Sequence, residues 1–138
     1  MSTLPEIRRA FWDRALASEA PRGVETYRDS NAILPLTGAG DVCLAFGIQQ
    51  DGSSIFLRSP VNASRDVARL RLEPRQVELR RLLATPFEAE GDAGQGRYFR
   101  KRVKLAFTQK SQWDGIVEWF GRCRARYEIV ITETLEAP

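Results

Sequence analysis

A chain of 138 residues with 43% hydrophobic and 28% charged side chains has the size and composition of one globular domain, which excludes disordered, collagen-like and disulfide-stapled proteins. Its formal net charge of +3, from 21 basic and 18 acidic residues, is lower than a dedicated nucleic-acid-binding protein often carries. No apolar run reaches the roughly 18 residues of a membrane helix, and the N-terminus lacks a signal-peptide core, so we expect a single cytoplasmic domain over residues 1–138.

The first predicted element is an amphipathic helix that ends near Pro21. Thr3 can cap its first turn, Pro5 suits that turn, and Glu6 completes the spacing of a capping box. Apolar residues then recur every three or four positions, which is the period of a helix with one buried face. They are Leu4, Ile7, Phe11, Trp12, Ala15 and Leu16.

A β-rich segment follows. Residues 31–36 predict a short strand that Pro35 confines to a sheet edge or interrupts. Residues 41–50 and 53–59 predict two strands of an antiparallel hairpin, because Asp51 and Gly52 form a dipeptide typical of hairpin turns.

The next segments predict a helix, two strands and a helix. Residues 62–84 are rich in Leu and Arg, and Pro74 predicts a kink or a division into two shorter helices. A short strand over 86–90, a glycine-rich loop and a long strand over 97–109 make a second hairpin. A helix follows from Ser111 to about Tyr127.

The tail from residue 128 to 138 is rich in β-branched residues, so it predicts either a last strand, which we favour slightly, or an extension of that helix. The resulting order is α-β-β-β-α-β-β-α. It predicts an α+β domain with an antiparallel sheet of four to five strands and helices packed on one face.

The sequence RYFRKRVK at 97–104 places five basic side chains in one predicted strand. With a period of two, Phe99, Lys101 and Val103 share the inner face with Arg97. The outer face then carries a tyrosine and a row of cations about 7 Å apart, close to the spacing of successive phosphates. This row is Tyr98, Arg100, Arg102 and Lys104.

Two interpretations of that row stay open. The cations could neutralise phosphates while Tyr98 stacks on an unpaired base. Alternatively, the outer face of a sheet covered by helices on one side simply needs polar residues, and basic side chains also discourage edge-to-edge aggregation. Further arginines in the second and third helices could enlarge the basic surface, although acidic neighbours such as Glu73 and Glu128 predict local charge cancellation.

The residues argue against catalysis. The chain has no histidine, the side chain most often used for proton transfer, and no Asp or Glu followed by x-Lys as in a restriction-type nuclease. Glu88, Glu90 and Asp92 could hold a hard cation, but a solvated strand end is the better interpretation. Cys43 and Cys123 lack a CxxC partner, so we expect reduced, buried thiols, and no metal or cofactor.

Several segments resemble a bacterial family of unknown function whose domain often lies C-terminal to restriction-endonuclease-like nuclease modules and sometimes stands alone. The shared segments are FWDRAL (11–16), GAGDVCLAFGIQQDGSSIFLRS (38–59), LLATPFEAE (82–90) and QWDGIVEWF (112–120). The resemblance implies an accessory or recognition domain that acts near DNA or in a defence system, and it brings no catalytic residues.

The sequence thus leads to one function and one alternative. We expect a non-catalytic accessory domain of a nucleic-acid-related or defence system that contacts DNA or RNA through Tyr98, Arg100, Arg102 and Lys104. The alternative is a protein-interaction or dimerisation module that uses a sheet edge or the margin at Trp119, with the cations serving solubility alone. Neither function involves a membrane.

Overall fold

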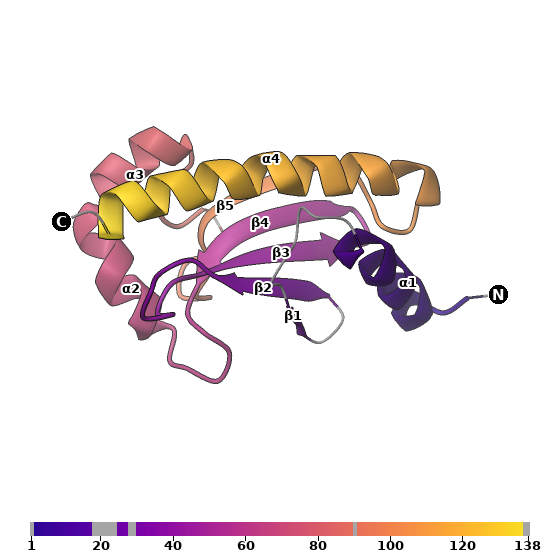
Figure 1. The fold of residues 1–138 in the computed structure, drawn as a ribbon, viewed down its shortest axis with the longest axis horizontal. Coiled ribbons are helices and arrows are strands. Elements are labelled where there is room, and N and C mark those ends of the chain that lie inside the picture. Colours follow the sequence, from indigo (N-terminus) through magenta and orange to yellow (C-terminus); the bar gives the residue numbers. More distant parts are fainter. Residues whose placement is uncertain (1, 18–24, 28–29, 90, 137–138) are drawn as a thin grey trace.

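The computed structural model describes residues 2–17, 25–27, 30–89 and 91–136, and it confirms the α+β class (Figure 1). Five antiparallel strands form one sheet in the order β1-β2-β3-β4-β5, so each strand pairs with its neighbours in the sequence. The strands are β1 (Glu25–Tyr27), β2 (Asn31–Pro35), β3 (Cys43–Gln49), β4 (Gly52–Arg58) and β5 (Tyr98–Val103).

The helices pack against one face of this sheet. Figure 1 shows α4 running along the sheet, with α1 at one end and α2 and α3 at the other. Buried residues of all four helices join one core with the inner side chains of the strands, such as Leu44, Phe46 and Leu57. The helices are α1 (Leu4–Leu16), α2 (Asp66–Leu72), α3 (Gln76–Leu83) and α4 (Trp113–Ile131).

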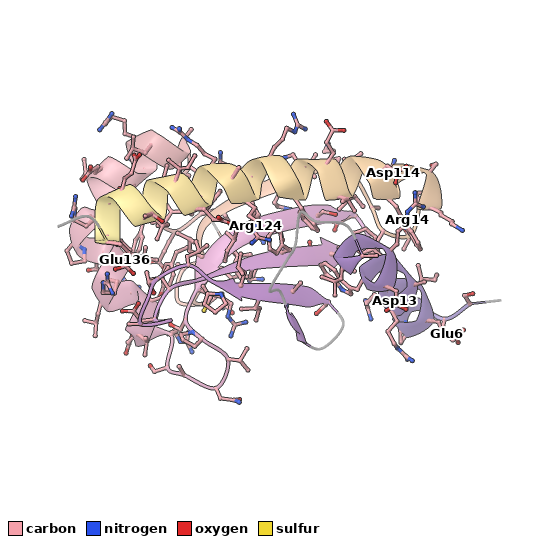
Figure 2. The ribbon with its side chains drawn as sticks, viewed as in Figure 1. Glu6, Asp13, Arg14, Asp114, Arg124 and Glu136 are labelled. Atoms are coloured by element: carbon pink, nitrogen blue, oxygen red, sulfur yellow. The ribbon has the colours of Figure 1, made fainter. Side chains whose placement is uncertain are left out.

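The first helix begins as the sequence predicts. The Thr3 hydroxyl accepts a hydrogen bond from the Glu6 backbone N–H, and Pro5 lies in the first turn. Phe11 and Trp12 pack against Phe120 of α4, with the Trp12 and Phe120 rings stacked at 6.2 Å. An exposed ion pair of 2.5 Å between Arg14 and Asp114 joins the same two helices (Figure 2). The predicted end near Pro21 lies outside the described residues.

The first hairpin is confirmed, with its turn one residue earlier than predicted. Gln49 pairs with Gly52, so Gln50 and Asp51 form the two-residue connection. Gly52 is instead the first residue of β4, and a Cβ atom there would lie 2.6 Å from the carbonyl oxygen of Val103. Glycine is therefore needed for the close approach of β5, not for the turn.

Pro74 divides the second helical segment, as predicted. Residues Glu73–Arg75 form a 3-10 turn between α2 and α3, which are otherwise continuous along the chain. Pro74 lies in the first turn of this short element, where its missing N–H costs no helical hydrogen bond.

The strand predicted from residue 86 is wrong, and the tail, for which a strand was slightly favoured over a helical extension, takes the helical form. Residues 86–89 form no strand, although Phe87 accepts a hydrogen bond from the Phe99 N–H at 3.0 Å. The tail is helical: α4 extends to Ile131 and a π-helical turn covers Thr132–Glu136. Tyr127, Val130 and Ile131 are buried in the core, and a helix can bury such residues three and four positions apart on one face, which a strand cannot.

Arginines of α2 hold this last turn in place. Arg71 donates to the Leu135 carbonyl at 3.2 Å, and Arg75, from the adjoining 3-10 turn, donates to that of Thr134 at 3.0 Å. Glu136 accepts a hydrogen bond of 2.7 Å from the Gly38 N–H. The two arginine bonds satisfy carbonyls that the end of a helix leaves without partners, and the Glu136 side chain ties the turn to the loop at Gly38. In the part of the chain described, no helix has both the length and the apolar character of a membrane span.

Candidate nucleic-acid interface

A β-bulge reverses the predicted alternation at the start of β5. Ser53, Ser54 and Ile55 of β4 pair with Val103, Arg102 and Lys101, but the register shifts before Leu57, which pairs with Tyr98. Phe99 lies at the shift with a positive φ of 52°, an unusual conformation for a bulky residue. Tyr98 and Phe99 are consequently both buried in the core, at 1% and 0% exposed.

The four predicted contact residues therefore divide into two groups. The prediction that Tyr98 lies on the outer face was wrong: its ring stacks on Phe87 at 5.0 Å, and its hydroxyl donates to the Arg65 carbonyl at 3.3 Å. Burial raises its pKa. Arg100 and Arg102 do lie on the second face of the sheet, where Arg102 is opposite Ser54. Lys104 is exposed just beyond the end of β5.

A groove of about 680 Å³ follows the second face of the sheet. Ser54 and Phe56 of β4 and Asn31 of β2 form part of its floor, and the loops at 59–65 and 95–97 border it. Within the described residues, the lining contains no carboxylate. Its cations are Arg8, Arg58, Arg65 and Arg97.

The cations are unequally placed along the groove. Arg58 is the last residue of β4. Arg97 comes just before Tyr98, which pairs with Leu57 near the same end of β4, and the Tyr98 hydroxyl donates to the Arg65 carbonyl. These three arginines therefore lie at one end of the groove. Arg8 lies at the opposite end, since its guanidinium is 5.6 Å from the ring of Phe107, which follows β5. The groove is thus most positive where β4 ends.

The glycine-rich loop that precedes Arg97 packs closely against Arg65. Gly96 has a φ of +74°, and a Cβ atom there would lie 3.1 Å from the Cβ of Arg65. A larger residue would push the loop away from Arg65 and would also be strained at this φ. The glycine-rich loop, predicted only as a connection between two strands, therefore shapes the basic end of the groove.

A buried carboxylate holds Arg97 and Arg100 side by side. Asp92 is 1% exposed, and its two oxygens lie 3.2 Å from the Arg97 Nε and 2.9 Å from the Arg100 Nε. The Arg97 Nε and the Asp92 Oδ2 atoms have no hydrogen-bond partner within the described residues, although they lie within ion-pair distance of the opposite charge. These contacts are therefore ion pairs without hydrogen bonds. One carboxylate facing two guanidinium groups leaves a positive charge in excess at this point of the surface.

Three arginines of the helical segments are locally paired, as predicted. Arg69 contacts Glu73 and Glu88, Arg75 contacts Glu78, and Arg124 contacts Glu128. These pairs lie between residues three or four apart, except for the contact of Arg69 with Glu88. These three arginines therefore add little net charge to the surface of the helices.

The other sequence candidates form no site. Glu88 and Asp92 contact different arginines, Glu90 lies outside the described residues, and no three or more metal-binding side chains gather elsewhere in the described part. Both cysteines are free; Cys43 is buried but Cys123 is only half-buried, and burial raises the pKa of each thiol. Trp119 is partly buried against the core.

Comparisons with protein-family models, curated proteins and solved structures find no match to this chain. The family resemblance drawn from the sequence therefore stays a prediction, and the functional argument rests on the geometry of the groove.

Proposed function

We propose that this domain is a non-catalytic module that contacts nucleic acid through the arginine end of the groove. The observation that carries the proposal is the gathering of Arg58, Arg65 and Arg97 at one end of a groove whose described lining holds no carboxylate. Cations placed in this way neutralise phosphates and release their counterions, which supplies most of the affinity of nonspecific nucleic-acid binding.

The basic strand contributes beside the groove rather than alone. Arg100 shares Asp92 with Arg97, and Arg102 lies opposite Ser54 of the groove floor with its side chain 47% exposed. Arg102 also contacts Asp51 at 3.3 Å, an exposed pair that costs little to exchange for a phosphate. Lys104 extends the same row. Tyr98 is removed from the proposed contact set because its ring is in the core.

The test is a salt titration of binding to a fluorescently labelled oligonucleotide, followed by anisotropy. Arg65→Ala with Arg97→Ala should lower the slope of log affinity against log salt by about 1.5, since each lost phosphate contact removes about 0.7 to 0.9. Circular dichroism of each variant checks that the fold is retained.

The matched control is Arg80→Ala with Arg81→Ala, which removes the same charge from two exposed positions of α3 outside the groove. Its slope should stay close to that of the unmodified protein. Equal losses in both variants, or no binding tighter than about 10⁻⁴ M at low salt, would contradict the proposal.

A second candidate, the protein-interaction module, is favoured by one separate observation. Leu70 of α2 and Val77 of α3 are 76% and 83% exposed, and apolar side chains at the surface can take part in a protein interface when they lie in one patch. If they mediate self-association, the mass in solution should exceed that of a monomer, and Leu70→Lys with Val77→Lys should restore the monomer. The role beside a nuclease or in a defence system rests on the family resemblance alone.

A further inference from the structure

The floor of the groove carries uncharged polar groups that a phosphate backbone does not need. Asn31, Gln49 and Ser54 converge over Gly47, because a Cβ atom at this glycine would lie 3.1 Å from the Asn31 Oδ1, 2.9 Å from the Gln49 Nε2 and 2.7 Å from the Ser54 Oγ. An amide oxygen, an amide nitrogen and a hydroxyl thus gather over the Gly47 backbone and take the room that a side chain there would need.

These groups are not used by the fold. In the part of the chain that the structure describes, none of the three atoms has a hydrogen-bond partner, although each belongs to a residue that lines the groove. Polar groups that converge in a hollow without an internal partner are the usual means by which a site fixes the orientation of a ligand. Together they offer donors and acceptors, which are the groups that hydrogen-bond to base edges.

The distance between this polar cluster and the basic end of the groove suits a short stretch of a nucleic-acid strand. From Ser54 to Arg58 the β4 backbone advances by four residues, or about 14 Å at the usual rise of a strand. A ligand that meets both places must therefore be extended and must carry phosphate at one end and hydrogen-bonding groups toward the other. A bare anion would reach the arginines alone.

From this geometry we infer that the ligand is a single-stranded nucleic acid, whose backbone contacts Arg58, Arg65 and Arg97 while its base edges contact Asn31 and Gln49; Ser54, at 1% exposed, lies beneath these two amides. The inference rests on the proposed function and narrows it. Only a single strand presents its Watson–Crick edges freely, and it can lie in a hollow of the protein surface. A duplex hides those edges and is normally read by a protruding helix or ribbon that enters its groove.

Hydrogen bonding, not stacking, carries the contact with the bases. Phe56 is the aromatic residue of the described lining, but it is only 5% exposed, so its ring offers little surface to a base. Single-strand binders that rely on stacking expose their aromatic rings. Truncation of the polar cluster should therefore weaken binding more than replacement of the phenylalanine by leucine.

The experiment compares three labelled probes at one salt concentration: a mixed-sequence DNA single strand of twelve nucleotides, its duplex, and heparin, a polyanion without bases. The single strand should bind about tenfold more tightly than the duplex. Asn31→Ala with Gln49→Ala should weaken single-strand binding by about three- to tenfold, as expected for one or two lost neutral hydrogen bonds. It should leave the salt slope and heparin binding unchanged.

Gln76→Ala, at an exposed position of α3, is the matched control and should bind like the unmodified protein. Gln49→Ala alone, at the end of β3, serves if the double variant unfolds. Equal or tighter binding of the duplex, or an equal loss of heparin binding in the variant, would overturn the inference while the proposed function stands. Failure of all three probes to bind would overturn both.

Discussion

The two faces of the sheet are built from the same strands but carry different kinds of side chain. Toward the helices, Leu44, Ile55 and Leu57 are fully buried and continue into one core with the four helices. On the second face a small apolar cluster is buried, made of Ile33, Cys43, Ala45 and Phe56, and the polar Ser54 is buried beside it. The expectation of a second face left entirely to water was thus too simple, although polar and basic side chains do occupy the rest of it.

The difference teaches that stability and binding are separated across the thickness of one sheet. Substitutions on the inner face should lower the free energy of unfolding and leave binding unchanged in the folded fraction. Substitutions of groove side chains should weaken binding and leave the free energy of unfolding unchanged. The five predictions below sharpen this comparison, beginning with the largest expected effect and ending with the smallest.

Phe99→Ala should lower the free energy of unfolding by about 3–5 kcal/mol, because it removes a fully buried aromatic ring from the core. Urea denaturation followed by circular dichroism measures the change. Arg102→Ala on the opposite face is the control and should stay within about 0.5 kcal/mol of the unmodified protein. A larger loss for Arg102→Ala would break the separation of the two faces.

The bulge itself can be tested at the same position. Because φ at residue 99 is 52°, Phe99→Gly should be more stable than Phe99→Ala by about 1 kcal/mol, the reverse of the usual order within a strand. The same denaturation experiment decides it. If the alanine variant is the more stable one, the backbone at residue 99 is extended. The β-bulge would then not explain why Arg97 lies on the second face and Tyr98 in the core.

Gly52→Ala should cost about 1–3 kcal/mol although it lies on the second face, since the added Cβ would meet the Val103 carbonyl oxygen at 2.6 Å and the backbone must shift. Gly38→Ala is the control, because nothing lies within 4 Å of its added Cβ and its φ is not positive. Equal melting temperatures for the two variants would show that β5 does not approach β4 so closely.

Tyr127→Phe and Tyr98→Phe compare one hydroxyl in the core with one near the groove. The Tyr127 hydroxyl donates to the Phe99 carbonyl at 2.5 Å in a fully buried position, and its loss should cost about 1–3 kcal/mol. The Tyr98 bond to the Arg65 carbonyl is longer, at 3.3 Å and partly buried, so its loss should cost under about 1 kcal/mol. Thermal denaturation should show a larger loss of stability for Tyr127→Phe than for Tyr98→Phe.

The smallest effect concerns Asp41, which joins the sheet to α2. Burial alone would raise its pKa, but hydrogen bonds from Thr37 and Arg71 and the charge of Arg71 outweigh burial and lower the pKa below its usual 3.8. The carboxylate therefore stabilises the fold above about pH 3.8, and this contribution is lost as the pH falls through the lowered pKa. It should amount to about 1 kcal/mol or less.

The measurement is the urea midpoint at pH 7 and at pH 3 for the unmodified protein and for Asp41→Asn. The variant should be less stable at pH 7 and should lose less stability on acidification. An identical pH dependence of the two proteins would show that Asp41 makes no such contribution.

Much of the fold followed from the sequence because its signals are local. The cap at Thr3, the period of the first and last helices, the hairpin at 41–59 and the division at Pro74 each depend on a few neighbouring residues. For the tail a strand was slightly favoured over a helical extension because β-branched residues such as Val130 and Ile131 favour strands on average, whereas packing against the core decides their conformation here.

The site was predictable in part. Alternation placed Arg100 and Arg102 correctly, but no local pattern marks a bulge, so Tyr98 and Arg97 were assigned to the wrong faces. Arg58 was missed, and Arg65 was considered only as one of several arginines that could enlarge the basic surface, because these two reach the groove from a strand end and a loop that are distant from β5 in sequence. The glycines at 94 and 96 were the one available signal, since each has a positive φ that favours glycine.

The bulge at Phe99 carries a consequence for any protein descended from a common ancestor with this one. A chain that lacks the extra residue would keep strict alternation, so it would need an apolar side chain at the position of Arg97 and a cation at that of Tyr98. Among such proteins, a change in the length of the preceding loop should therefore be accompanied by an exchange of the residue types at these two positions.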